Sequence, residues 1–313
     1  MDLQNVKNYF ASGSSILIVQ QHNTQDQLNF VIWESPTNKT INIVLPILFH
    51  PRKVHQYIYA HEQNYILVSN RRGAKCLFTS YDKSEYFVRI TCQFDSIFSS
   101  EQCPIVVHPY LPGIIYANLR DENNQLFTFV SVNDGRSFIP MRFENEKLQC
   151  PEKRCYIKLK IECKIQSNIQ FPMEWMAIFQ HQYNSKQPHL RQLVTFDGGI
   201  TWKQTPFQNL QAIILNSGGL IVGVDSATRE IAYSFDEGKK WFHKDIINQD
   251  EKFVFLVPNG NYQKEFVSII GLHKDSLYWV VSRVNFSNIL SILTKNRPDM
   301  PRARLYALEG TKT

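Results

Sequence analysis

Residues 231–242 read Ile231-Ala232-Tyr233-Ser234-Phe235-Asp236-Glu237-Gly238-Lys239-Lys240-Trp241-Phe242. The centre of this stretch has the form Ser-x-Asp-x-Gly-x-x-Trp, a turn motif known as an Asp-box. Hydrophobic residues flank the turn on both sides, as a β-hairpin requires. Another apolar run, Leu220-Ile221-Val222-Gly223-Val224, lies just upstream. We interpret the stretch as strand, turn and strand, and as one copy of a repeat.

Three more versions of the motif occur upstream. The best-formed copy consists of Thr195, Asp197, Gly199 and Trp202, and another of Ser131, Asn133, Gly135 and Phe138. A worn copy begins at Ser80 and has Ser84 where glycine belongs. The copies start at positions 80, 131, 195 and 234, which are 51, 64 and 39 residues apart. This spacing suits a four-stranded blade of about 40 to 50 residues with variable loops, the unit of a β-propeller.

Each position of the motif has a predicted structural task. The Ser or Thr and the Asp can bond to the backbone of the turn, and the Gly can take a positive φ that other residues resist. The Trp or Phe is expected to enter the core between blades. Asp197 and Asp236 are therefore predicted to build turns rather than to act as catalytic carboxylates.

A second repeat accompanies the first. Residues 48–51 (Leu-Phe-His-Pro) lead to the apolar run 57–60, and residues 106–109 (Val-Val-His-Pro) lead to the run 113–117. Each is interpreted as a loop entering a strand, so His50 and His108 are predicted to pack at equivalent places rather than to serve as bases or ligands. Counting strand-rich segments between these landmarks predicts about six blades or part-blades.

The composition supports an all-β globular domain. The 313-residue chain is 43% hydrophobic and 13% aromatic, which is ample for a buried core. Short runs of β-branched and aromatic residues alternate with turn residues, and no stretch keeps a helical period long enough for a helical domain. We therefore predict a propeller over residues 1–293 and a disordered tail over residues 294–313.

Charge and hydropathy argue against two classes of partner. The net charge is +6, and the basic residues gather only between residues 152 and 164. That cluster is interpreted as a solvated loop face rather than a nucleic-acid site, because no aromatic stacking platform accompanies it. No apolar run is long enough for a membrane helix, and the amino terminus lacks the regions of a signal peptide, which taken alone indicates the cytosol.

The cysteines and two glycosylation sequons instead indicate the secretory pathway. The chain has six cysteines, in the groups Cys76, Cys92, Cys103 and Cys150, Cys155, Cys163. An even number suits disulfides in an oxidising compartment, although the sequence leaves their pairing open. Zinc is disfavoured because there is no Cys-x-x-Cys pair or nearby His at finger spacing, so no metal or cofactor is assigned. Asn38 and Asn285 begin sequons consistent with secretion.

The order of these motifs resembles that of the sortilin-type vacuolar sorting receptors. The likeness rests on residues 197–202, then 216–222, then 230–241, and it extends upstream over 113–118, 130–138 and 150–159 and downstream over 279–290. It implies that the chain corresponds to the carboxy-terminal part of a ten-bladed propeller. It also implies a local disulfide between Cys150 and Cys155, which their short separation permits.

The chain departs from that family in several ways. No cysteine follows Leu290, where the family has a cysteine-rich module, and the earlier blades, signal peptide and membrane helix are missing. The chain could therefore be the later half of a larger propeller or a free-standing relative that closes six blades into a ring. The closed ring is the physically favoured alternative, because an open arc would expose blade faces and edge strands to aggregation.

The resemblance implies a non-enzymatic module that binds peptide or protein ligands for transport between Golgi and endosomes, with any membrane contact made by parts absent from this chain. No residue can be assigned to the ligand site. The alternatives are an Asp-box glycosidase and an intracellular scaffold. A sialidase needs three converging arginines and a Tyr nucleophile, and no set of residues with that spacing is found here. An inverting glycosidase needs two carboxylates on facing loops, and the sequence does not exclude such a pair.

Overall fold

The computed structural model describes residues 5–21, 28–35, 37–81, 84–95, 103–144, 157–182, 190–207, 212–225, 229–259, 265–275, 278–287 and 311–312. The chain forms two compact units. The first comprises Met1–Trp175 with Asp197–Thr201, and the second comprises Met176–Phe196 with Trp202–Thr313.

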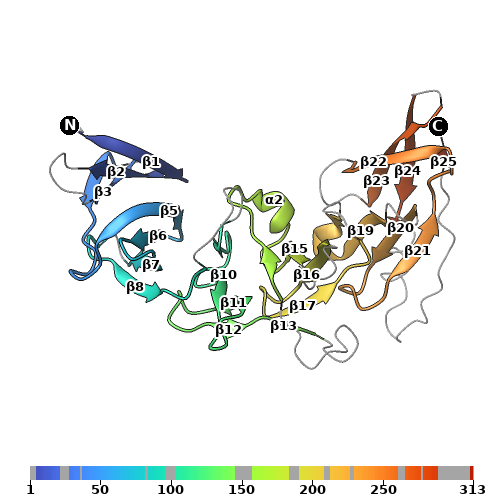
Figure 1. The fold of residues 1–313 in the computed structure, drawn as a ribbon. Helices are drawn as coiled ribbons and strands as arrows, with labels where there is room; N and C mark the ends of the chain where they lie inside the picture. Colours follow the sequence, from blue (N-terminus) through green and yellow to red (C-terminus); the bar gives the residue numbers. More distant parts are fainter. Residues whose placement is uncertain are drawn as a thin grey trace, which may run out of the picture. The chain divides into compact units, whose positions relative to one another are not determined.

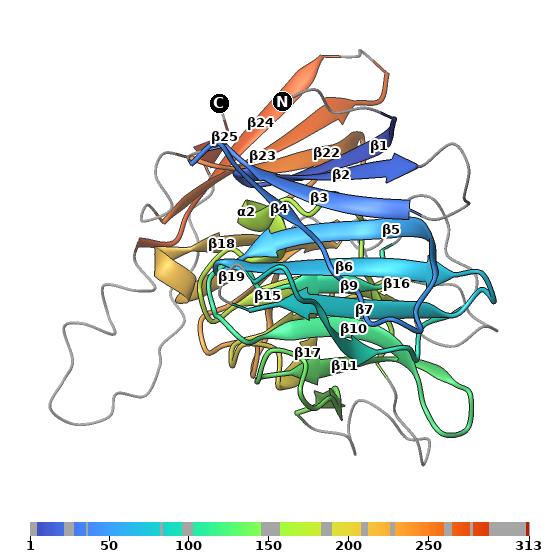
Figure 2. The ribbon, with the colours of Figure 1, turned by 90° about the vertical axis from the view of Figure 1, so that its left-hand side faces the viewer.

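The first unit contains three antiparallel sheets whose strands pair in chain order (Figures 1 and 2). The first sheet consists of β1 (Val6–Ser12), β2 (Ser15–Gln21), β3 (Leu28–Glu34) and β4 (Lys39–Asn42). The second consists of β5 (Pro51–Ala60), β6 (Gln63–Asn70), β7 (Lys75–Ser80) and β8 (Val88–Thr91). The third consists of β9 (Ile105–Val107), β10 (Ile115–Arg120), β11 (Leu126–Ser131) and β12 (Ile139–Pro140). The short elements β13 (Arg142–Phe143), β14 (Leu159–Lys160) and α2 (Ser167–Gln170) follow.

The second unit continues the same pattern. The strands β15 (Ala177–Gln182), β16 (Leu190–Thr195) and β17 (Thr201–Gln204) pair in succession. The next sheet consists of β18 (Ile213–Leu215), β19 (Leu220–Asp225), β20 (Glu230–Ser234) and β21 (Phe242–Asp245), with η1 (Asn216–Gly218) between its first two strands. The last sheet consists of β22 (Glu251–Pro258), β23 (Phe266–His273), β24 (Trp279–Asn285) and β25 (Thr311–Lys312).

The fold is a β-propeller built of four-stranded blades, as the sequence predicts. Six sheets are present in the part of the chain that the structure describes, five with four strands and one with five, and most consecutive strands within them form antiparallel hairpins. Figure 2 shows β5, β6 and β7 side by side in one such sheet. The four-stranded sheet is the repeating unit of a propeller.

The cores explain why the middle strands of each blade are so apolar. Every residue of β7 is buried, because this strand has a neighbouring strand on each side and packed side chains on both faces. Leu17, Ile32, Ile66 and Phe78 pack the first two sheets of the first unit together. In the second unit a corresponding cluster joins the sheets of β18–β21 and β22–β25. Burying each large apolar side chain contributes about 1.5–3 kcal/mol.

The proposed His-Pro repeat is wrong. His50 precedes β5, the first strand of its sheet, whereas His108 follows β9, so it lies between the first and second strands. The two positions therefore differ within the blade. His108 is fully buried, which confirms its packing role, but His50 is exposed.

Other predictions fall only partly within the described residues. Thr311–Lys312 pair with β24, whereas residues 288–310 lie outside the described part, so the tail stays a prediction there. No helix in the described part of the chain is long and apolar enough to cross a membrane.

Candidate functional site

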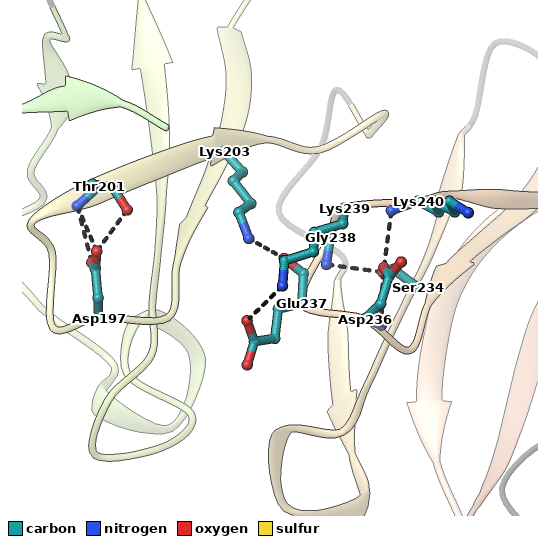
Figure 3. Close-up of polar contacts among 9 residues, drawn as sticks. All are labelled: Asp197, Thr201, Lys203, Ser234, Asp236, Glu237, Gly238, Lys239 and Lys240. Carbon is teal, nitrogen blue, oxygen red and sulfur yellow. Dashed lines mark hydrogen bonds and ion pairs between the residues drawn. The ribbon is translucent and has the colours of Figure 1, made fainter. Parts of the chain in front are cut away.

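The turn between β20 and β21 is closed by side chains. The Ser234 hydroxyl accepts a hydrogen bond from the Gly238 amide at 2.9 Å and donates one to an Asp236 carboxylate oxygen, also at 2.9 Å. The same Asp236 oxygen accepts a hydrogen bond from the Lys240 amide at 2.9 Å (Figure 3). Two side chains thus bind backbone amides that would otherwise lack partners in so tight a turn.

The turn between β16 and β17 uses its carboxylate in the same way. Asp197 accepts hydrogen bonds from the amides of Ile200 and Thr201, both at 3.0 Å. The Thr201 hydroxyl also donates to Asp197, at 2.6 Å (Figure 3). Thr195 is buried at the end of β16.

The third turn carries the amide Asn133 in place of the carboxylate. Ser131 donates to Asn133 Oδ1 at 3.0 Å, and the same oxygen accepts the Ser137 amide at 3.0 Å. The Gly135 amide donates to the Ser131 hydroxyl at 2.8 Å. The contacts of the Ser234 turn therefore recur with an uncharged group.

Two consecutive residues of each turn have positive φ, which the sequence pattern predicts for only one. Gly135, Gly199 and Gly238 have φ of 83°, 97° and 75°. The residues just before them are left-handed too: Asp134 (59°), Gly198 (70°) and Glu237 (60°). Glycine is suited to this region because it has no Cβ, whereas other residues adopt it at a cost.

The worn copy forms a different turn. The Ser80 hydroxyl donates to the Ser84 carbonyl oxygen at 2.5 Å, and the Ser84 hydroxyl accepts the Tyr86 amide at 3.2 Å. Asp82 and Lys83 lie outside the described residues. Assignment of the three other turns as Asp-boxes remains a prediction.

The aromatic residues of the motif are buried to different degrees. Trp202 is fully buried and contacts the Phe179 ring edge to face, with the ring centroids 6.2 Å apart. Trp241 is only half-buried and meets the Phe207 ring at 5.2 Å. Phe138 is also half-buried and packs against the core of the second and third sheets.

Lys203 makes a contact that the sequence motif does not predict. Its ammonium donates to the Glu237 carbonyl oxygen at 2.8 Å, as Figure 3 shows, and lies 5.2 Å from the centre of the Phe196 ring. Burial lowers the pKa of Lys203, and the nearby Glu237 carboxylate partly offsets this shift. No local signal marks this lysine, because its partner is a carbonyl oxygen 34 positions away in the sequence.

The side chains of these turns stabilise the turns themselves, and their carboxylates are not arranged as a general acid and a general base. Asp197 and Asp236 each use carboxylate oxygens to bind amides of their own turn. A general acid or base would instead present a proton-transfer atom to a substrate. The described residues also contain no group of three or more His, Cys, Asp or Glu side chains placed to hold a metal.

The described cysteines form two disulfides, Cys76–Cys92 and Cys103–Cys163. These pairings were open in the sequence. Cys150 and Cys155 lie outside the described residues, so their expected disulfide stays a prediction.

The two sequon asparagines differ in their surroundings, because Asn38 lies in a turn and Asn285 is the last residue of β24. Asn38 is exposed and accepts a hydrogen bond from the Trp33 indole at 3.0 Å. Asn285 is half-buried and accepts bonds from the amide and the hydroxyl of Ser287, the third residue of its own sequon. Their glycosylation remains a prediction.

Comparison with known proteins finds similarity to one family. Residues 108–255 match the Sortilin-Vps10 family model, described as sortilin, neurotensin receptor 3. Sortilin from Danio rerio is 32% identical over 105 residues, which are 31% of this chain and 13% of that protein. Vacuolar protein sorting/targeting protein 10 from Aspergillus terreus is 21% identical over 198 residues, which are 56% of this chain and 12% of that protein.

A solved structure that is similar to the chain is the β-propeller domain of the Trilobed protease from Pyrococcus furiosus. Its TM-score is 0.40 at 10% identity, and the match covers 90% of this chain and 79% of that one.

The sheets define the protein as a β-propeller of four-stranded blades. Its resemblance to the sortilin-type sorting receptors is confirmed by the family model, over residues 108–255, and by the two curated relatives. The matched segments span only 13% and 12% of those relatives' lengths.

Proposed function

We propose that this chain is a non-enzymatic, ligand-binding propeller module of a sorting receptor, which captures peptides or proteins for transport between Golgi and endosomes. The observation that carries the proposal is the Sortilin-Vps10 match over residues 108–255. The printed names of both curated relatives support it, since one is Sortilin and the other is a vacuolar protein sorting/targeting protein.

The cysteines support a lumenal location for this module. Disulfides form and persist in the secretory pathway and are rare in the cytosol. Non-reducing peptide mass spectrometry of the protein from its native source tests this point. Linked peptides for Cys76–Cys92 and Cys103–Cys163 are expected. Free thiols at all four positions would favour the intracellular scaffold instead.

Peptide binding by the oxidised full chain tests the receptor function directly. The probes are neurotensin, which the family description names, and peptides selected from a random display library. Saturable binding by titration calorimetry, lost when the sequence of the peptide is scrambled, is the expected result. If neurotensin does not bind and selection yields no sequence-dependent peptide, the proposal fails.

A fluorogenic sialoside and xyloglucan test the competing glycosidase function. Asp197, Asp236 and Asn133 each accept hydrogen bonds from backbone amides of their own turns. These side chains therefore have a structural role. No turnover is expected from the pure chain. Turnover that disappears on replacement of a single carboxylate would make the protein an enzyme.

A further inference from the structure

A cavity separates the first strands of the first two sheets. At one end of these strands, the Tyr59 amide of β5 donates to the Ser12 hydroxyl of β1 at 2.8 Å. Beside this contact, the hydroxyls of Ser15 and Tyr57 lie 2.6 Å apart. Towards their other ends, β1 and β5 border a cavity of about 700 Å³. All of its lining residues belong to the first compact unit.

The mouth of this cavity is strongly basic. Lys7 of β1, Arg52 and Lys53 of β5, and Arg71 of the turn after β6 contribute to the lining. No lining residue that the structure describes is acidic. Each of the four side chains is exposed, and none belongs to an ion pair in the described part of the chain. Four like charges from three segments create a positive potential that favours an anion.

Lys53 contributes to the electrostatic environment of two neighbouring groups. Burial lowers the pKa of His55 on β5 to about 4, and the charges of Lys75 and Lys53 add to the shift. Burial also lowers the pKa of Lys75, where Lys53 acts in the same direction and Asp95 opposes it.

The inner wall of the cavity is apolar. Val19, Leu28 and Val54 are at most 6% exposed, and Phe10 is half-buried beside them. Cavities that bind small organic molecules have volumes of about 300–1,000 Å³, mostly apolar walls and a few polar groups that fix orientation. The observed cavity has this combination, with the cations at its mouth.

We propose that this cavity binds a small organic anion with an apolar body, a carboxylate or a phosphate monoester, whose charged group lies among Lys7, Arg52, Lys53 and Arg71. The apolar body would contact Phe10 and the aliphatic wall. The site lies outside residues 108–255, which match the family model, and it does not depend on the peptide-binding function proposed above.

Titration calorimetry on the oxidised full chain tests the site with octanoate and octyl phosphate. Octylammonium carries the same apolar body with the opposite charge, and inorganic phosphate carries an anion without that body. One-to-one binding of at least one octyl anion is expected, at least about tenfold tighter than either control. The preferred octyl anion distinguishes a carboxylate from a phosphate ligand. Equal binding of octylammonium, or no saturable binding of either octyl anion, would overturn the proposal.

The double variant Arg52→Gln/Lys53→Gln localises the binding. It should weaken the preferred octyl anion by at least about tenfold, because it removes two of the four cations. The matched control Lys39→Gln/Arg89→Gln removes the same charge from exposed residues that do not line the cavity. The control should bind within about twofold of the unmodified chain. Equal affinity in the two double variants would place the anion elsewhere and contradict the proposal.

Discussion

At the residue scale, two independent effects can require glycine at a position: a left-handed backbone conformation, and a neighbouring group that leaves no room for a Cβ. Gly73 has φ of +84° in the turn after β6, and a Cβ there would meet nothing within 4 Å. Gly199 has φ of +97°, but a Cβ there would overlap the Tyr116 ring. Tyr116 is fully buried and donates to the Gly198 carbonyl oxygen at 2.8 Å, so its ring is held in place.

Alanine substitution should therefore separate the two effects. Gly73→Ala should lower the unfolding free energy by about 1–2 kcal/mol, the cost of a left-handed residue with a side chain. Gly199→Ala should cost about 1–3 kcal/mol more, because the added methyl group overpacks the Tyr116 ring. Urea unfolding of the full chain, followed by circular dichroism, measures both. Equal losses would show that Tyr116 moves aside freely.

The environment of His108 predicts a pH dependence of stability. Its Nδ1 accepts hydrogen bonds from the amides of Tyr110 and Leu111, at 3.2 and 3.1 Å. Nδ1 therefore cannot take a proton without losing both bonds. Burial, followed by the charge of His61, lowers the pKa of His108 to about 4. The unfolded histidine takes up its proton near pH 6.5, so lowering the pH from about 6.5 to 4 favours unfolding, by up to about 3 kcal/mol.

His108→Asn isolates this contribution, since the asparagine Oδ1 can accept the same two amides and does not titrate. The unfolding free energy is measured from pH 7 to pH 4 for both proteins. Relative to its value at pH 7, the variant should retain more stability at pH 4 than the unmodified chain. His55 has its pKa lowered in the same direction, so some loss is expected to persist in the variant. Parallel curves for the two proteins would contradict the assignment to His108.

At the element scale, local sequence signals predicted the hairpins correctly, but they did not show which strand of a blade follows each His-Pro pair. The turns at Asp197 and Asp236 could be read because all their bonding partners lie within four residues in the sequence. The His-Pro repeat was wrong because a histidine, a proline and an apolar run can precede the first or the second strand of a blade. Sequence similarity between His50 and His108 does not fix which strand follows.

The missed features of the elements are long-range ones. Lys203 of β17 donates to Glu237 in the turn after β20, and Tyr116 contacts Gly198 across 82 positions of sequence. The basic cavity combines Arg52 and Arg71, which lie at the paired ends of β5 and β6, with Lys7 of the first sheet. The adjacent pairs Arg52-Lys53 and Arg71-Arg72 were visible signals, but neither indicates a cavity until the neighbouring strand is placed.

At the scale of the whole molecule, covalent links and buried polar contacts stabilise the first unit together. Cys103 lies just before β9 and is bonded to Cys163, and the Cys103 amide donates to the Ile161 carbonyl oxygen at 3.0 Å. Nearby, the Asn118 side-chain amide donates to the Leu159 carbonyl oxygen at 3.0 Å. The segment containing β14 is thus attached to the third sheet by the disulfide and by hydrogen bonds.

The two described disulfides should differ in their contribution to stability because they close loops of different length. Cys76–Cys92 spans 16 residues and Cys103–Cys163 spans 60. Loop-closure entropy predicts losses of about 3 kcal/mol for Cys76→Ala/Cys92→Ala and about 4 kcal/mol for Cys103→Ala/Cys163→Ala. Urea unfolding under oxidising conditions should rank the three proteins in that order. Reduction should lower the stability of the unmodified chain below that of either oxidised variant, because it opens both loops. If reduction leaves its unfolding midpoint unchanged, the disulfides do not stabilise this unit and the support they give to an oxidising compartment is lost.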